Sequence, residues 1–210
     1  MNRFAFALLL VLLTIKAGQG QSDLDAVTAI TRLRHGLLLV RLPSPTARLQ
    51  ALEQAGQTQR AEQVRRQYEE QNQLIADAFR EEFHFCRYLF VFSDAMAALL
   101  EGRRAGIFLN AALQPDSSLA IGDTFFLIAT IGRPVLYGSH TGSRNNGMPQ
   151  PSLFGEALVI HDASLRQLTD PFPFSAREDF ITHLFGGDWR KKVRNLNQRL
   201  FAFADAVGQQ

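Results

Sequence analysis

The sequence predicts an α/β fold, with a single domain built on a mixed sheet of about five strands covered by helices. Short apolar runs bounded by turn residues, which are typical of buried strands, alternate with helical patterns. A long helical segment separates the first two runs, which favours parallel pairing, whereas the closer runs near the end of the chain suit antiparallel pairing. Both a thioredoxin-like and a Rossmann-like layering fit this order.

The first predicted elements are a short helix and a buried strand. Residues 24–35 predict a helix because apolar side chains recur at three-residue steps, at Leu24, Val27, Ile30 and Leu33. Gly36 breaks this pattern. Residues 37–42 (LLLVRL) then form an apolar run that ends before Pro43, and they predict a buried strand.

A long helical region follows the first strand. Ser44 and Pro45 are typical of a helix start, with serine as the N-cap and proline in the first turn. The helical pattern covers residues 45–83, and Gly56 divides it because glycine favours the end of a helix. The second half has charged outer faces and one apolar stripe, which predicts a surface helix packed by one side: Ala61, Val64, Tyr68, Ile75, Ala78 and Phe79.

The remaining elements are strands, a short helix and a long final helix. Apolar runs predict strands over residues 86–92, 107–109, 124–131 and 156–161. After the first of these runs, Ser93 and Asp94 are expected to cap a short helix over residues 95–101.

The final helix is predicted over residues 188–207, with Asp188 as its cap and Gly208 as its stop. Its apolar seam is typical of a core face: Trp189, Val193, Leu196, Leu200, Phe203 and Val207.

The first 20 residues have the pattern of an export signal. Arg3 precedes an apolar run over residues 4–15, which spans roughly 18 Å as a helix and falls short of the roughly 30 Å hydrocarbon core of a bilayer. Small residues at Gly18 and Gly20 suit cleavage before Gln21. We therefore expect residues 21–210 to be a periplasmic or secreted protein with no membrane span. An uncleaved anchor is the alternative.

Charge and cysteine content argue against several classes of protein. The chain has 22 Lys and Arg against 20 Asp and Glu, and the two excess positive charges, Arg3 and Lys16, belong to the predicted signal. A balanced mature chain argues against nucleic-acid binding driven by net charge. A single cysteine excludes an intrachain disulfide, and the five histidines lack the spacing of a metal site. No metal or cofactor is expected.

Three segments are similar to an uncharacterised family of exported bacterial proteins. They read FHFCRYLFVFSD, IFLNAALQPDSSLAIGDTFFLIATIG and EALVIHDASLRQLTDPFPF, and the resemblance covers roughly residues 36–205. It rests on the Phe-rich strand, the Phe-Leu-Asn step, the Gln-Pro-Asp-Ser-Ser turn and the Pro-Phe-Pro-aromatic element. The resemblance implies an exported α/β domain and transfers no catalytic residue.

The segment over residues 133–152 is the predicted ligand-binding loop. It combines basic and aromatic side chains with Gly, Asn and Pro, at Arg133, Tyr137, His140 and Arg144. Two arginines and a histidine suit a small anionic ligand. The Gly-rich part, residues 138–147, lacks the Lys-Ser/Thr ending of a phosphate-binding P-loop. A long hairpin loop without a binding role is the alternative.

Cys86 and His84 form the first possible catalytic pair. On a strand, a spacing of two places both side chains on one face, where the histidine could activate the thiol. The aromatic neighbours instead favour a structural core cysteine. The first strand is followed by Pro-Ser-Pro rather than a cysteine pair, which excludes ordinary disulfide exchange.

Two later segments also carry candidate residues. His161 and Asp162 end a predicted strand, where sites of α/β proteins form. The element over residues 170–174 holds two phenylalanines, which are expected to pack on the sheet unless they face a partner.

These observations favour a non-enzymatic exported protein that binds a protein partner or a small anionic ligand in the cell envelope. The absence of a catalytic motif is weak evidence, because active sites assemble from distant residues. One alternative is therefore a hydrolase or transferase with His140 or His161 as its base. A structural component of an envelope assembly is the other alternative.

Overall fold

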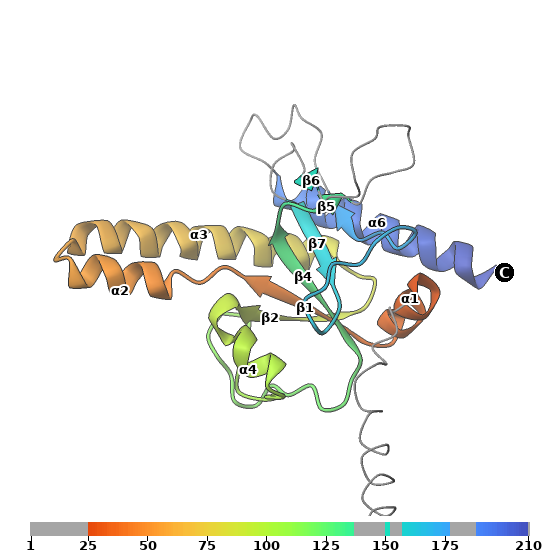
Figure 1. Cartoon of the computed structure of the whole chain (residues 1–210), viewed down its shortest axis with the longest axis horizontal. Coiled ribbons are helices and arrows are strands. Elements are labelled where there is room, and N and C mark those ends of the chain that lie inside the picture. Colours follow the sequence, from red (N-terminus) through yellow and green to blue (C-terminus); the bar gives the residue numbers. More distant parts are fainter. Residues whose placement is uncertain (1–24, 137–149, 152–156, 177–187, 210) are drawn as a thin grey trace, which may run out of the picture.

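The computed structural model describes residues 25–136, 150–151, 157–176 and 188–209, and it has an α/β fold with helices covering a single mixed sheet (Figure 1). The main sheet has six strands where the sequence predicts about five, in the order β3-β2-β1-β4-β7-β8. These strands are β1 (Leu37–Leu42), β2 (Arg87–Phe92), β3 (Phe108–Leu109), β4 (Phe126–Gly132), β7 (Ala157–His161) and β8 (Ser175–Ala176). The additional strand is β8, which is too short to give an apolar run.

The centre of the sheet is parallel and its outer strands are antiparallel. β1 pairs in parallel with β2 on one side and with β4 on the other, as the long helical connection predicts. β7 and β8 pair antiparallel, and so does β3 on the opposite edge. The order β2-β1-β4, with all three strands parallel, is that of the first three strands in a flavodoxin-like doubly wound sheet.

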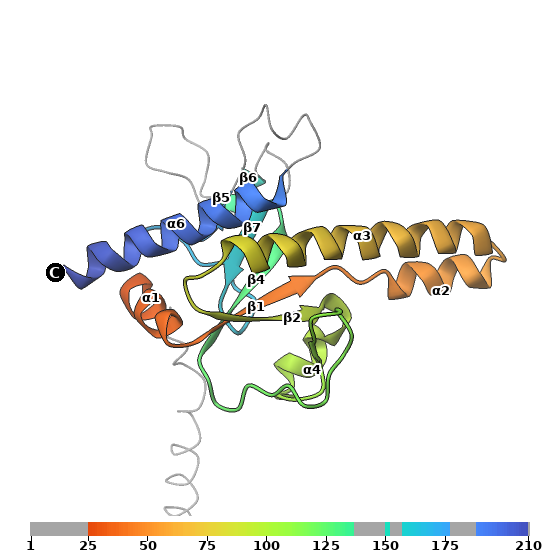
Figure 2. The same cartoon turned by 180° about the vertical axis from the view of Figure 1, so that it is seen from behind.

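Three helices cover one face of the sheet, which Figure 2 shows from their side. They are α1 (Ala26–Arg34), α3 (Thr58–Glu82) and α6 (Trp189–Gly208). Their apolar stripes meet alternate residues of the strands, including Leu38 and Val40, in the larger hydrophobic cluster. Val193, Leu196 and Leu200 are fully buried, which confirms the seam of the last helix as a core face.

The other face of the sheet is covered where β1 and β4 begin. The covering residues are η1 (Ser93–Ala95), α4 (Met96–Leu100) and the residues that follow them. Leu37 and Leu39 point to this face and pack with Met96 and Leu99 in the smaller hydrophobic cluster. The last residues of β1 and β4 on this face lie outside the cluster, so these positions can carry polar side chains.

The predicted long helix is divided at Gly56, which has a φ of +69° and separates α2 (Thr46–Gln54) from α3. Glycine adopts this left-handed conformation without steric cost. The two helices extend together past the end of the sheet (Figure 1). The N-cap differs from the prediction by one residue, because α2 starts after Pro45. The Ser44 hydroxyl still accepts from the backbone N–H of Thr46 at 3.4 Å, but its closer contact is with the Asp94 carboxylate at 2.8 Å.

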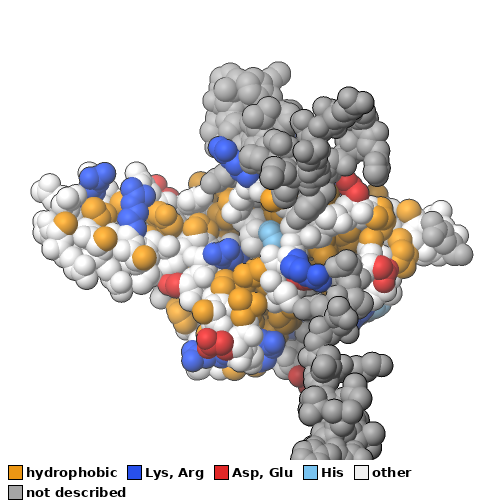
Figure 3. All heavy atoms as spheres, in the orientation of Figure 1, with side chains coloured by type: hydrophobic (Ala, Val, Ile, Leu, Met, Phe, Trp, Pro, Cys, Tyr) orange, Lys and Arg blue, Asp and Glu red, His pale blue; other side chains and the backbone are white. Residues whose placement is uncertain are grey.

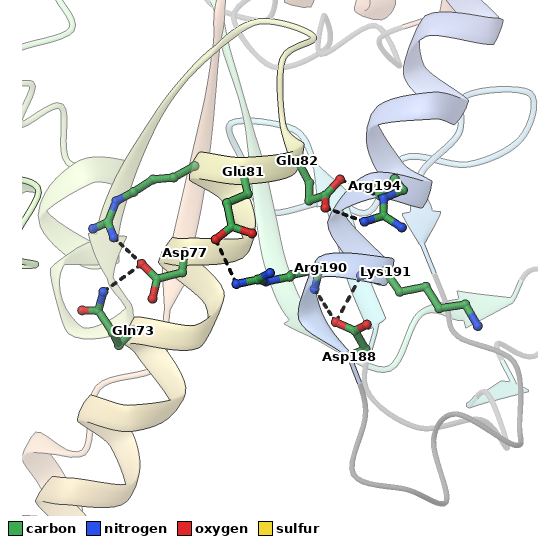
Figure 4. A network of polar contacts seen from close by, with 9 residues as sticks. Gln73, Asp77, Glu81, Glu82, Asp188, Arg190, Lys191 and Arg194 are labelled. Carbon is green, nitrogen blue, oxygen red and sulfur yellow. Dashed lines mark hydrogen bonds and ion pairs between the residues drawn. The ribbon is translucent and has the colours of Figure 1, made fainter.

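Ion pairs join the end of α3 to the start of α6 (Figure 4). Arg190 pairs with Glu81 at 2.9 Å, and Arg194 pairs with Glu82 at 2.6 Å. Asp188 caps α6 as predicted, because its carboxylate accepts a hydrogen bond from the backbone N–H of Arg190 at 2.9 Å. These contacts are largely exposed, so they orient the helix more than they stabilise it.

A close approach of two backbones explains Gly36, between α1 and β1. A Cβ atom at this position would lie 2.6 Å from the carbonyl oxygen of Phe125 and 2.8 Å from that of Arg32. Any side chain would therefore push α1 away from the sheet. Gly36 therefore ends the apolar pattern of α1 because only glycine fits between these two carbonyl oxygens.

Candidate functional site

The parallel strands β1, β2 and β4 end at the same edge of the sheet, where α/β proteins commonly bind their ligands. Three polar side chains occupy the face that α4 leaves uncovered. Arg41 of β1 is paired in register with Thr130 of β4, and the Thr130 hydroxyl lies 3.3 Å from Nδ1 of His161 on β7. The three side chains thus form a row across neighbouring strands. Figure 3 shows a histidine between basic side chains near the middle of this face.

Arg41 is a half-buried cation without an anionic partner among the described residues. Its Nε atom is buried and makes no hydrogen bond. Leaving a buried donor of a charged group unpaired costs more than the roughly 1–3 kcal/mol of a neutral one. The guanidinium is therefore positioned to gain from an anion that reaches its exposed nitrogens.

His161 is a neutral imidazole at the end of β7. Burial lowers the pKa of His161, and the positive charge of Arg41 contributes in the same direction. Nδ1 lies 3.1 Å from the carbonyl oxygen of Val159, which can only accept. The proton of the neutral ring is therefore on Nδ1, and Nε2 carries the lone pair.

A crevice of about 260 Å³ lies at the ends of β1 and β4. Polar side chains from four elements line it, together with Pro43 and Ile131: Arg41, Ser44, Tyr68, Gln71, Ser93 and Thr130. This volume suits a small ligand rather than a nucleotide.

The loops after β1 and β2 are tied together beside the crevice. The backbone N–H of Ser44 donates to the Ser93 hydroxyl at 2.9 Å, and the hydroxyls of Ser44 and Thr46 each lie 2.8 Å from Oδ2 of Asp94. Ser93 and Asp94 were expected to cap the next helix, and that prediction is wrong. They link the two strand ends because the charged Asp94 carboxylate is a stronger acceptor for these hydroxyls than a neutral oxygen.

A larger pocket of about 860 Å³ lies next to the row and is lined by both Arg133 and His161. Asp162, in its wall, accepts from Nε of Arg166 at 2.9 Å and from the backbone N–H groups of Ser164 and Arg166. Gln167 holds the chain next to Arg133, because its amide both accepts from and donates to the backbone of Val135. Hydrogen bonds within the chain thus hold this wall of the pocket in place.

The structure joins two of the regions that the sequence singles out. Arg133 lines the same pocket as residues 170–172 of the Pro-Phe-Pro element. Phe172 and Phe174 are buried in the larger cluster, which confirms that they pack on the sheet. The pair β5 (Val135–Leu136) and β6 (Gln150–Pro151) is an antiparallel hairpin stem, as expected for residues 133–152. The other predicted site residues, Tyr137, His140 and Arg144, lie outside the described residues.

The pairing of Cys86 with His84 does not hold. Both residues precede β2 rather than lying on it, so the spacing of two does not place them on one face. Cys86 packs against the larger hydrophobic cluster, and burial raises the pKa of its thiol to about 12. A thiol with this pKa is protonated at neutral pH and is no nucleophile.

Sequence reasoning missed Arg41 and Thr130. Arg41 has a detectable signal, because it is the single charged residue in the apolar run of residues 37–42 and directly precedes the end of the strand. Thr130 has none, since threonine is common in strands.

Within the described ranges, no cluster of His, Cys, Asp or Glu has the arrangement of a metal site. In the same part of the chain, no helix is long and apolar enough to cross a membrane. The chain matches no protein-family model, no curated protein and no solved structure. The candidate site therefore stands on its own geometry.

Proposed function

We propose that the protein is a non-enzymatic binding protein that holds a small anionic ligand at the ends of β1 and β4. The observation that carries this proposal is Arg41, a half-buried guanidinium without an anionic partner in the described part of the chain. A carboxylate or phosphate group can accept two parallel hydrogen bonds from a guanidinium. Thr130 and Ser93 add hydroxyls in the same crevice.

The protonation state of His161 reports on the proposed anion. Its Nδ1 proton is directed to the carbonyl oxygen of Val159, so the neutral ring donates no hydrogen bond to the anion. Burial is the main cause of its lowered pKa, and the positive charge of Arg41 adds a smaller repulsion. An anion beside Arg41 would screen this repulsion. Ligand binding is therefore expected to raise the pKa of His161.

Calorimetric titration with phosphate, sulfate, acetate and succinate tests the proposal. Arg41→Gln is expected to weaken binding at least tenfold, a loss of about 1.4 kcal/mol. Arg87→Gln is the matched control, since Arg87 is an exposed arginine on the neighbouring strand β2. Equal binding by both variants, or no binding of any of these anions, contradicts the proposal.

The predicted loop contributes to the same proposal through Arg133, which borders the pocket beside His161. Replacing Arg133 and Arg144 together by Ala is expected to weaken anion binding with little loss of stability. Unchanged affinity would remove the loop from the proposed site and leave Arg41 as its centre.

The export of the protein remains part of the proposal, supported by the pattern of residues 1–20. Mass spectrometry of the protein from the exported fraction is expected to give a chain that begins at Gln21. An intact chain from Met1 would favour the anchor. Under native conditions, extra mass above a whole number of chains would identify a retained ligand.

A hydrolase or transferase with His161 as its base is the second candidate. Its supporting observation is the free lone pair on Nε2 of a neutral imidazole. Among the described residues, however, no hydrogen bond joins this ring to a carboxylate, because Asp162 is occupied by Arg166. A turnover screen that detects activity lost in His161→Gln but kept in His35→Gln would favour this candidate.

A further inference from the structure

A third cavity, of about 470 Å³, shares Ser44 and Tyr68 with the crevice. It is lined by residues 44–46, by α3, by the end of β2 and by residues 112–114, which follow β3. We name it the α3 cavity. Neither the anion site nor the predicted loop includes its remaining residues.

One buried side-chain oxygen among the described residues of its wall has no hydrogen-bond partner. Asn72 is 5% exposed and lines the α3 cavity. Its Nδ2 donates to the carbonyl oxygen of Pro43 at 3.0 Å, which fixes the orientation of the amide. Its Oδ1 is buried and has no hydrogen-bond partner. A buried acceptor left unpaired is costly, so the wall of this cavity calls for a donor.

The charged groups of the cavity also favour a ligand that donates hydrogen bonds, and one that carries a positive charge. Partial burial raises the pKa of Asp94, but the hydroxyls of Ser44 and Thr46 outweigh this effect, and the net pKa lies below the usual range. Asp94 is therefore a carboxylate at neutral pH. Glu69 is exposed, and no described cation pairs with it. Among the described residues of the lining, the one basic side chain is Arg65, which is already paired with Glu53 and Glu62.

Two polar groups of the lining are acceptors that suit a donor ligand, namely the Asp94 carboxylate and Oδ1 of Asn72. The Ser44 and Thr46 hydroxyls both donate to Oδ2 of Asp94 and lie 2.8 Å from each other. An ammonium group carries three donors and a positive charge, and it matches this set. The apolar part of the wall, formed by Pro45, Phe92 and Leu113, suits an alkyl chain.

We propose that the α3 cavity binds the ammonium group of an alkylamine, between the Asp94 carboxylate and the amide of Asn72. The site is separate from the proposed anion site, although the two cavities share Ser44 and Tyr68. An amine that also carries an anionic group could occupy both, but the present proposal needs only the ammonium.

Calorimetric titration of the purified protein with n-butylammonium chloride tests this site. Binding is expected at millimolar concentrations, while 1-butanol, which has the same alkyl chain and no charge, is not expected to bind. Tetramethylammonium, a cation without N–H donors, is expected to bind at least tenfold more weakly. No binding of butylammonium, or equal binding of tetramethylammonium, overturns the proposal.

Two variants locate the binding. Asp94→Asn keeps the size and one acceptor oxygen of the side chain, removes its charge and is expected to weaken butylammonium at least tenfold. Asp123→Asn is the control, because Asp123 is an exposed carboxylate away from the cavity. Equal loss in both variants, or no loss in Asp94→Asn, contradicts the proposed site.

A measurement on the unmodified protein covers the case in which Asp94→Asn fails to fold. The side-chain NH₂ signals of Asn72 in a ¹⁵N-correlated NMR spectrum are expected to shift as butylammonium is added. Unshifted Asn72 signals at saturation would place the amine elsewhere. Arg41→Gln separates this proposal from the anion site, because it should lose anion binding and keep butylammonium binding.

Discussion

Cys86 precedes β2 and rests against the larger hydrophobic cluster. Because burial raises the pKa of its thiol to about 12, its thiolate fraction at pH 8 is more than a thousandfold (roughly 2,000-fold) below that of a thiol with an ordinary pKa of about 8.5. A thiol-specific chromogenic disulfide reagent is therefore expected to label the folded protein very slowly and the guanidinium-unfolded protein rapidly. Equal rates would show that the cysteine is accessible and reactive.

At the same scale, His161 predicts a dependence of stability on pH. The pKa of His161 in the folded protein lies below 6.5, the ordinary pKa of a histidine side chain. His161 therefore takes up a proton more readily in the unfolded chain than in the folded one. The free energy of unfolding is therefore expected to fall as the pH drops below 6.5, until the folded histidine is itself protonated. Urea unfolding at pH 7.5 and 5.5 measures this loss, which His161→Gln should reduce. His35→Gln, at an exposed position, should leave it unchanged.

At the scale of the element, α3 has one buried and one exposed face. Phe79 is fully buried and its ring meets Phe83, Tyr88 and Phe90, whereas Leu74 on the same helix is 60% exposed. Phe79→Ala is expected to lower the free energy of unfolding by about 3–5 kcal/mol. Leu74→Ala should change it by no more than about 0.5 kcal/mol. Chemical denaturation of both variants tests which face packs, and a larger loss in Leu74→Ala would contradict the assignment.

At the scale of the whole molecule, the two hydrophobic clusters share the same strands. In β1, Leu38 and Val40 belong to the larger cluster, and Leu37 and Leu39 belong to the smaller one. Unfolding of either cluster would therefore expose one face of the sheet to water. The described residues are therefore expected to unfold in one cooperative transition. Fluorescence of Trp189, the only tryptophan, reports on α6, and far-ultraviolet circular dichroism reports on all elements. Their thermal midpoints should coincide, and separate midpoints would indicate two folding units.

Much of the architecture follows from local patterns. The strand over residues 37–42 and the stripe of α3 are where the apolar periodicity predicts them, because burial selects apolar side chains at regular spacing. The N-cap at Asp188 also follows from a local rule. The roles of Ser44 and Asp94 could not be predicted in this way, since their hydrogen bond joins residues 50 positions apart.

The candidate site was predicted in part. The sequence singles out Arg133 and His161 for their charge and position, but it does not indicate that they border the same pocket. The apolar run identifies Arg41 only as part of a buried strand, and its place beside Thr130 depends on which strands pair with β1. Tyr137, His140 and Arg144 remain predictions, because they lie outside the described residues.

The sequence by itself determined the α/β class, the helix that covers one face of the sheet over residues 58–82 and the cap at the start of the last helix. Each of these depends on propensity and on periodic burial, which operate over a few residues. Only the tertiary structure decided the order β2-β1-β4 and the row of Arg41, Thr130 and His161 across it. Strand pairing joins segments far apart in the chain, so the neighbours of a side chain are set by the folded sheet.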